Sequence, residues 1–187
     1  MLTRALAVLA VFVVACSGQK PRLLHPEDPS TDFYAVSPGI YRGGRLDEGG
    51  MLRLQKLGVK TILNLENDGA AITLEAKWAK AGSILQVSSP LSGEWTPNDA
   101  QVDRILALLA DPSKRPIYIH CMKGMDRTGM IVALHRVYNE GWTRDRAEQE
   151  RDAIGFNHWL GYLDRYYAWK AGRYHAKVPG WALAARS

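Results

Sequence analysis

Residues 116–129 restrict the fold of this 187-residue chain more than any other segment. Residues 116–120 read Pro-Ile-Tyr-Ile-His, an apolar run that predicts a buried strand, and apolar residues beyond Thr128 recur mostly on one helical face. The loop between them contains Gly124, and a loop that enters a helix in this way can wrap its backbone N–H groups around an anion. The segment therefore predicts an α/β fold, with an anion-binding loop between the last buried strand and the following helix.

Strand and helix patterns alternate in the rest of the sequence. We expect a short strand pair in residues 33–42, a helix in 47–57, a strand in 59–65, a helix in 70–81 and a strand in 83–88. Thr96 is the expected N-cap of a helix that reaches residue 110, with Asp99 in its first turn. Residues 143–153 predict a charged helix, and the aromatic side chains of 159–175 are expected to pack in the core. This order predicts a short, mainly parallel central sheet flanked by helices.

The first residues predict an exported lipoprotein. Arg4 precedes the apolar run 5–15, which is typical of a secretory signal and falls well short of the ~20 residues that a membrane-spanning helix needs. The run ends in Val13-Val14-Ala15-Cys16, which resembles the lipobox of bacterial lipoproteins; a chance cysteine after an ordinary cleavage site is the alternative. Acylation of Cys16, followed by the non-acidic Ser17, implies an anchor in the outer membrane facing the periplasm. Residues 16–32 are polar and proline-punctuated, which predicts a flexible tether.

Cysteine usage and charge narrow the possible functions. The chain has two cysteines, so acylation of Cys16 leaves Cys121 as the only free thiol, without a partner for an internal disulfide. The net charge of +5 permits attraction to anionic substrates, but the basic residues are scattered and no nucleic-acid-binding motif is present. We expect one domain in residues 33–176, a C-terminal tail in 177–187, and no nucleic-acid partner.

The loop carries a family resemblance. Five residues separate Cys121 from Arg127, and Thr128-Gly129 follow, which resembles the Cys-x5-Arg loop of protein tyrosine and dual-specificity phosphatases. Residues 37–42 and 57–65 resemble the opening of compact bacterial, plant and fungal atypical dual-specificity phosphatases, especially the exported bacterial type. The resemblance covers most of residues 33–142. It implies a protein-tyrosine-phosphatase-like fold and hydrolysis of phosphomonoesters through a cysteinyl-phosphate intermediate, with no cofactor and no metal.

The loop residues divide into chemical roles. A positive environment stabilises the thiolate of Cys121, which is the expected nucleophile, and Arg127 offers a planar fork to two phosphate oxygens. Thr128 is expected to donate its hydroxyl to Cys121 as the sulfur departs, and His120 to orient the loop by hydrogen bonding. The expected phosphate-binding set is Met122, Lys123, Gly124, Met125, Asp126 and Arg127.

Two residues are candidates for the general acid that protonates the leaving oxygen. Glu94 lies in the irregular stretch 92–95, where the family places its acid, although most relatives use aspartate there. Asp126 precedes Arg127 in a pair that resembles the Asp-Arg pair of myotubularin-like lipid phosphatases. Asp126 can therefore donate the proton from within the loop, or it can hold the guanidinium of Arg127 in place. Asp99 is expected to be engaged at its helix N-terminus. The sequence leaves both Glu94 and Asp126 open.

The substrate class also stays open. A domain of this size predicts a shallow pocket. Lys123, Arg42 and Arg45 would add positive charge suited to polyphosphorylated inositols as well as phosphoproteins, but Arg42 and Arg45 can equally form structural ion pairs. We expect a monomer that acts on a phosphorylated protein or an inositol phosphate. The alternative is a phosphate-binding lipoprotein module that has lost efficient proton donation.

Overall fold

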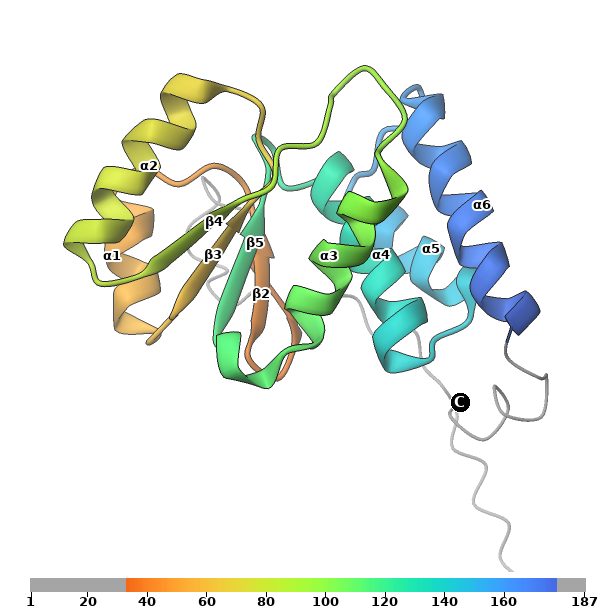
Figure 1. Ribbon diagram of the computed structural model, residues 1–187, viewed down its shortest axis with the longest axis horizontal. Helices are drawn as coiled ribbons and strands as arrows, with labels where there is room; N and C mark the ends of the chain where they lie inside the picture. Colours follow the sequence, from red (N-terminus) through yellow and green to blue (C-terminus); the bar gives the residue numbers. More distant parts are fainter. Residues whose placement is uncertain (1–32, 178–187) are drawn as a thin grey trace, which may run out of the picture.

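The computed structural model describes residues 33–177 as a sheet of five short strands with helices on both sides (Figure 1). The strands are β1 (Tyr34–Ser37), β2 (Ile40–Gly43), β3 (Thr61–Asn64), β4 (Leu85–Ser88) and β5 (Ile117–His120). The helices are α1 (Glu48–Lys56), α2 (Gly69–Ala81), α3 (Asp99–Ala110), α4 (Asp126–Glu140), α5 (Arg144–Ala153) and α6 (Gly161–Lys177), with a 3-10 turn, η1 (Pro112–Lys114). The expected signal, tether and most of the tail lie outside the described residues.

The strand order is β1-β2-β5-β3-β4, and only β1 runs antiparallel to its neighbour. Gly43 of β2 and Asn64 of β3 both pair with His120, the last residue of β5. The parallel strands therefore end together, and the residues that follow them meet at one edge of the sheet. The prediction of a mainly parallel sheet flanked by helices is confirmed.

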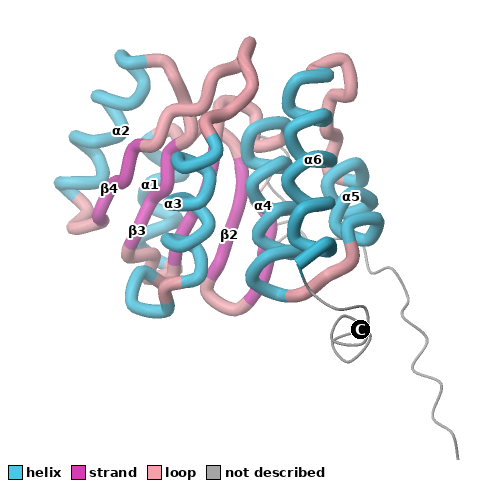
Figure 2. The backbone as a smooth tube through the Cα atoms, turned by 45° about the vertical axis from the view of Figure 1, so that its right-hand side comes forward, coloured by secondary structure: helices cyan, strands magenta, loops and turns pink. Residues whose placement is uncertain are grey.

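Helices cover both faces of the sheet. Helices α1 and α2 lie on one face, and α3, α4, α5 and α6 lie on the other (Figures 1 and 2). Alternate side chains of β5 enter different cores, because Ile117 and Ile119 pack with α3, α4 and α6, whereas Tyr118 packs with residues of α1 and α2. All four residues of β5 are buried, which explains the apolar run in the sequence. Among the described helices, none combines the length and the apolar character needed to cross a bilayer.

Two helix starts differ from the sequence prediction. Helix α3 begins at Asp99, and its N-cap is Asn98, whose side chain accepts a hydrogen bond from the N–H of Gln101 at 3.0 Å. The prediction of Thr96 as the N-cap was wrong, because the N-cap is the residue directly before the first helical residue, and that residue is Asn98. Asparagine caps a helix as well as threonine does, so the residue type did not distinguish the two positions. Helix α4 begins at Asp126, two residues before the expected start, and its N-terminus has no side-chain cap.

Candidate active site

The loop between β5 and α4 lies directly against the end of β2. Gly124 has a φ of +71°, and a Cβ added there would come within 2.2 Å of the carbonyl oxygen of Gly43. A positive φ favours glycine, and the contact with backbone leaves no room for a side chain. The close approach of the two backbones therefore requires glycine at position 124.

The start of α4 offers free donors to an anion. The N–H groups of Asp126, Arg127 and Thr128 belong to the first turn and have no acceptor within the helix. The N-cap residue, Met125, makes no side-chain capping bond. Open N–H groups and the positive end of the helix dipole together favour a bound phosphate and a nearby thiolate.

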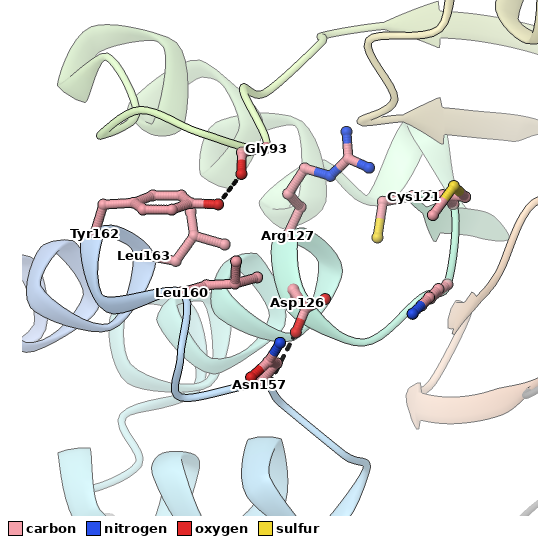
Figure 3. Close-up of a pocket in the computed structure, with 10 residues that line it drawn as sticks. Gly93, Cys121, Asp126, Arg127, Asn157, Leu160, Tyr162 and Leu163 are labelled. Atoms are coloured by element: carbon pink, nitrogen blue, oxygen red, sulfur yellow. Dashed lines mark hydrogen bonds between the residues drawn. The ribbon is translucent and has the colours of Figure 1, made fainter.

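A pocket of about 260 Å³ opens above this helix start. Cys121 belongs to its lining, is buried, and is the free cysteine of the described part of the chain. Figure 3 shows Cys121, Asp126 and Arg127 bordering the same space. The full lining is Gly93, Cys121, Met122, Lys123, Asp126, Arg127, Asn157, Leu160, Tyr162 and Leu163. Five of the expected site residues thus meet in one cavity.

Arg127 is held by the loops that follow β3 and β4. Its Nη1 donates to the side-chain oxygen of Asn67 at 3.0 Å, and to the carbonyls of Leu65 at 3.4 Å and Leu91 at 3.3 Å. These bonds keep the guanidinium at the edge of the pocket, where it can reach an anion above Cys121 (Figure 3).

His120 is fully buried beneath the loop. Its Nε2 lies 2.7 Å from Oε2 of Glu75, and its Nδ1 lies 3.4 Å from the carbonyl oxygen of Cys121. Burial disfavours the ionised form of Glu75, but hydrogen bonds from His120, Gln86 and Asn64 outweigh it and lower its pKa. The carboxylate therefore fixes the imidazole ring, and Glu75 is a supporting residue that no motif in the sequence marked.

Thr128 lies at the first turn of α4 and is completely buried. Its Oγ1 makes no hydrogen bond to any residue in the described range 33–177, so the expected bond to Cys121 is not formed in this structure. The hydroxyl remains an unpaired donor close to the loop, and its role in sulfur departure stays a prediction.

The three acidic residues considered from the sequence lie in different places. Asp126 lines the pocket, and its Oδ1 accepts a hydrogen bond from the N–H of Asn157 at 2.9 Å. Glu94 is exposed and lies outside the lining. Asp99 does not serve as an N-terminal cap; it bonds the hydroxyl of Tyr166 at 2.9 Å and pairs with Lys170, which links α3 to α6. Asp126 is thus the one of the three that shares the pocket with Cys121.

Arg42 and Arg45 both make structural contacts. Arg42 is 1% exposed, and its Nη2 donates to the carbonyl of Gly124 at 2.6 Å; burial lowers its pKa to about 10. Arg45 pairs with Glu66 and Asp68, and its hydrogen bond to Glu66 raises its pKa. Neither Arg42 nor Arg45 belongs to the pocket lining. The cationic side chains in that lining are Lys123 and Arg127.

Sequence reasoning missed the wall of the pocket opposite the loop. Tyr162 was expected in the core, but it lines the pocket with Leu160 and Leu163, and its hydroxyl donates to the carbonyl of Gly93 (Figure 3). Tyr166 and Tyr167 are buried as expected. No sequence signal separates these three tyrosines, because only the packing of α6 decides which one faces the site. Within residues 33–177 there is no cluster of three His, Cys, Asp or Glu side chains placed to hold a metal ion.

Known proteins share this architecture. Residues 30–158 match the family model described as "DSP-PTPase phosphatase fused to NAD+ Kinase". The dual specificity protein phosphatase TpbA of Pseudomonas aeruginosa strain UCBPP-PA14 is 30% identical over 159 residues, which span 80% of this chain and 70% of TpbA.

Solved structures agree with the sequence match. The crystal structure of P. aeruginosa TpbA has a TM-score of 0.67 at 25% identity and covers 80% of this chain and 92% of that one. The core catalytic domain of the PP-IP phosphatase SIW14 from S. cerevisiae has a TM-score of 0.63 at 20% identity, covering 78% and 91%, a likeness that concerns the fold. With the family model matching well over half of its residues, the chain belongs to this family of dual-specificity-type tyrosine phosphatases and is a cysteine-dependent phosphatase.

Proposed function

We propose that this phosphatase acts on phosphorylated proteins and prefers phosphotyrosine, the ester of an aromatic alcohol. The observation that carries the proposal is the apolar wall of Leu160, Tyr162 and Leu163 in the pocket that Cys121 also lines. An aryl ring packs against such a wall, whereas a polyphosphorylated inositol needs several cations. Two cationic side chains line the pocket, because Arg42 and Arg45 are engaged elsewhere.

In the proposed reaction, the thiolate of Cys121 attacks phosphorus, an S–P bond forms and the P–O bond to the leaving group breaks. Arg127 and the N–H groups at the start of α4 bind the phosphoryl oxygens as charge develops on them. Asp126 protonates the leaving oxygen and then takes a proton from the water that cleaves the S–P bond. Inorganic phosphate leaves, and the thiolate is restored.

The role of Asp126 is supported by its place in the pocket lining beside Cys121. A general acid contributes about 10²–10⁴-fold to the rate, and its loss matters most for a poor leaving group. We expect Asp126→Asn to slow an alkyl phosphate much more than p-nitrophenyl phosphate, and Glu94→Gln to affect neither by more than a few-fold. If Glu94→Gln shows the leaving-group dependence and Asp126→Asn does not, the acid is Glu94. As a control for the cysteine-dependent mechanism, the wild type should hydrolyse p-nitrophenyl phosphate in the presence of a metal chelator. Cys121→Ser and Arg127→Ala should lose this activity.

Substrate preference is tested with a panel of phosphotyrosine peptides, phosphoserine and phosphothreonine peptides, and inositol polyphosphates. We expect the highest kcat/KM for phosphotyrosine. Tyr162→Ala should raise KM for aryl phosphates while leaving alkyl phosphates nearly unchanged, because only the ring packs against the wall. Higher kcat/KM for an inositol polyphosphate than for any phosphopeptide would refute the preference.

We further propose that the protein is exported and anchored through acylated Cys16 in the outer membrane, facing the periplasm. The support is the lipobox-like run 13–16 after a short apolar segment. Fatty-acid labelling in a bacterial host should mark the wild type and Cys121→Ser, but not Cys16→Ser, which should also leave the membrane fraction. Equal labelling of Cys16→Ser would contradict this assignment.

A further inference from the structure

We propose that Arg42 is a positioning residue that orients backbone N–H groups of the phosphate-binding loop, an inference that rests on the proposed function. Arg42 lies in β2 and is 1% exposed, beneath the loop. Its Nη2 donates to the carbonyl oxygen of Gly124 at 2.6 Å and lies 3.5 Å from that of Met125. The guanidinium therefore holds two successive carbonyls from the side opposite the pocket.

The geometry of the peptide group links this contact to the orientation of the N–H groups at the anion site. In a trans peptide group the C=O and the N–H point in opposite directions. Because Arg42 holds the Gly124 carbonyl toward β2, the N–H of Met125 points away from β2 and toward the phosphate side. The N–H of Arg45 donates to the carbonyl of Met122 at 3.0 Å, which turns the N–H of Lys123 in the same way. The orientations of two loop N–H groups, those of Lys123 and Met125, thus depend on contacts from residues 42–45.

The bonding of Arg42 differs from that of an ordinary structural arginine. Its Nε and Nη1 are buried and make no hydrogen bond within the described residues, so its bonds are concentrated on the loop carbonyls. Burial lowers its pKa, while the charges of Glu150 and Cys121 raise it, so the cation and the Cys121 thiolate attract each other. A buried and partly unpaired cation destabilises a fold by itself, and such departures from good packing are typical of functional sites.

Arg151 provides a matched comparison. It is also 1% exposed, but it pairs with the carboxylates of Glu148, Asp152 and Asp164, and its guanidinium lies 3.9 Å from the centre of the Phe156 ring. Within the described residues, these polar contacts go to α5 and α6, and none goes to a carbonyl of the phosphate-binding loop. Replacement of Arg151 therefore reports the cost of losing a buried arginine without removing a hydrogen bond to the loop carbonyls.

The experiment uses the full chain with Cys16→Ser, in which Cys121 is the only cysteine, and compares Arg42→Met, Arg42→Lys and Arg151→Met. Orthovanadate affinity and the pH dependence of Cys121 alkylation by iodoacetamide are measured, with thermal unfolding as the folding check. Neither readout needs turnover, so a wild type that fails to hydrolyse phosphoesters would refute the proposed function without deciding the role of Arg42.

We expect Arg42→Met to weaken vanadate binding about 10- to 100-fold, the range for losing a charge-assisted hydrogen bond, and to move half-maximal alkylation to higher pH. Arg42→Lys should keep the pH dependence of alkylation, because the positive charge remains. It should lose vanadate affinity, because lysine lacks the planar guanidinium that holds the two loop carbonyls. Arg151→Met should unfold at lower temperature and bind vanadate within about twofold of the wild type.

A folded Arg42→Met that binds vanadate as tightly as the wild type would overturn the proposal. If Arg42→Met does not fold, Arg42→Lys decides, and wild-type vanadate affinity in that variant would overturn it. An equal loss of affinity in Arg151→Met would also overturn it, because the effect would then be general destabilisation.

Discussion

Substitution of Gly124 by alanine tests how closely the phosphate-binding loop is fitted to β2. The φ of +71° costs a residue with a Cβ about 1–2 kcal/mol. The new Cβ would also meet the oxygen of Gly43 at 2.2 Å and its carbonyl carbon at 2.3 Å, both backbone atoms that cannot rotate away. Relief requires a shift of about 1 Å, and overpacking of this kind costs about 1–3 kcal/mol. The two contributions predict a destabilisation of about 2–5 kcal/mol.

The activity should fall even if the protein remains folded. A shift of about 1 Å in groups that position a substrate costs about 100-fold in rate, so we expect a loss of that size in kcat/KM. Thermal unfolding followed by circular dichroism should show a decrease in Tm of about 6–15 °C for a domain of this size. Vanadate should stabilise the variant less than it stabilises the wild type, because the loop amides are displaced.

Gly58 is the matched control. It has a φ of +68°, and an added Cβ would meet no atom within 4 Å, so Gly58→Ala isolates the conformational cost from the steric cost. We expect this variant to lose about 1–2 kcal/mol and to keep its activity. If Gly124→Ala is no less stable than Gly58→Ala and retains kcat/KM within a few-fold, the steric argument is refuted.

Two charge clusters give further predictions. Burial opposes ionisation of Glu140, but hydrogen bonds from basic neighbours lower its pKa to about 2 from 4.5, so its contribution is present above pH 4.5 and lost as the pH falls toward 2. Between about pH 5 and about pH 3 the wild type should lose about 1 kcal/mol more than Glu140→Gln in urea unfolding, and equal losses would contradict this. The Lys170 side chain is 4% exposed, whereas its partners Asp99 and Asp103 are 43% and 59% exposed. Lys170→Met should therefore lower the free energy of unfolding by about 1 kcal/mol. The double variant Asp99→Asn, Asp103→Asn should lower it by about 3 kcal/mol, because it leaves the buried ammonium of Lys170 unpaired. A larger loss for Lys170→Met than for the double variant would refute this reasoning.

The sequence alone determined the α/β fold, the parallel sheet and the position of the loop. Those features depend on local patterns: the apolar run before His120, the glycine at 124 and the helical periodicity after Thr128. A loop between a buried strand and a helix has few alternative geometries, so residues close in sequence were enough to bring Cys121 and Arg127 together. The N-cap of α3 was misplaced because Thr96 and Asn98 carry similar capping signals.

Only the tertiary structure decided which distant side chains reach that loop. Glu94 and Asp126 both stayed open in the sequence as the general acid; the path of the chain after β4 leaves Glu94 exposed and outside the pocket lining, whereas Asp126, at the start of α4, belongs to that lining. Arg42 was expected either to add positive charge around the pocket or to form a structural ion pair, but pairing of β2 with β5 places it under the loop, where its guanidinium donates to the Gly124 carbonyl. Tyr162 lines the same pocket as Cys121 because α6 packs against α4. Contacts between residues far apart in the chain depend on how the elements pack, and no local pattern encodes that packing.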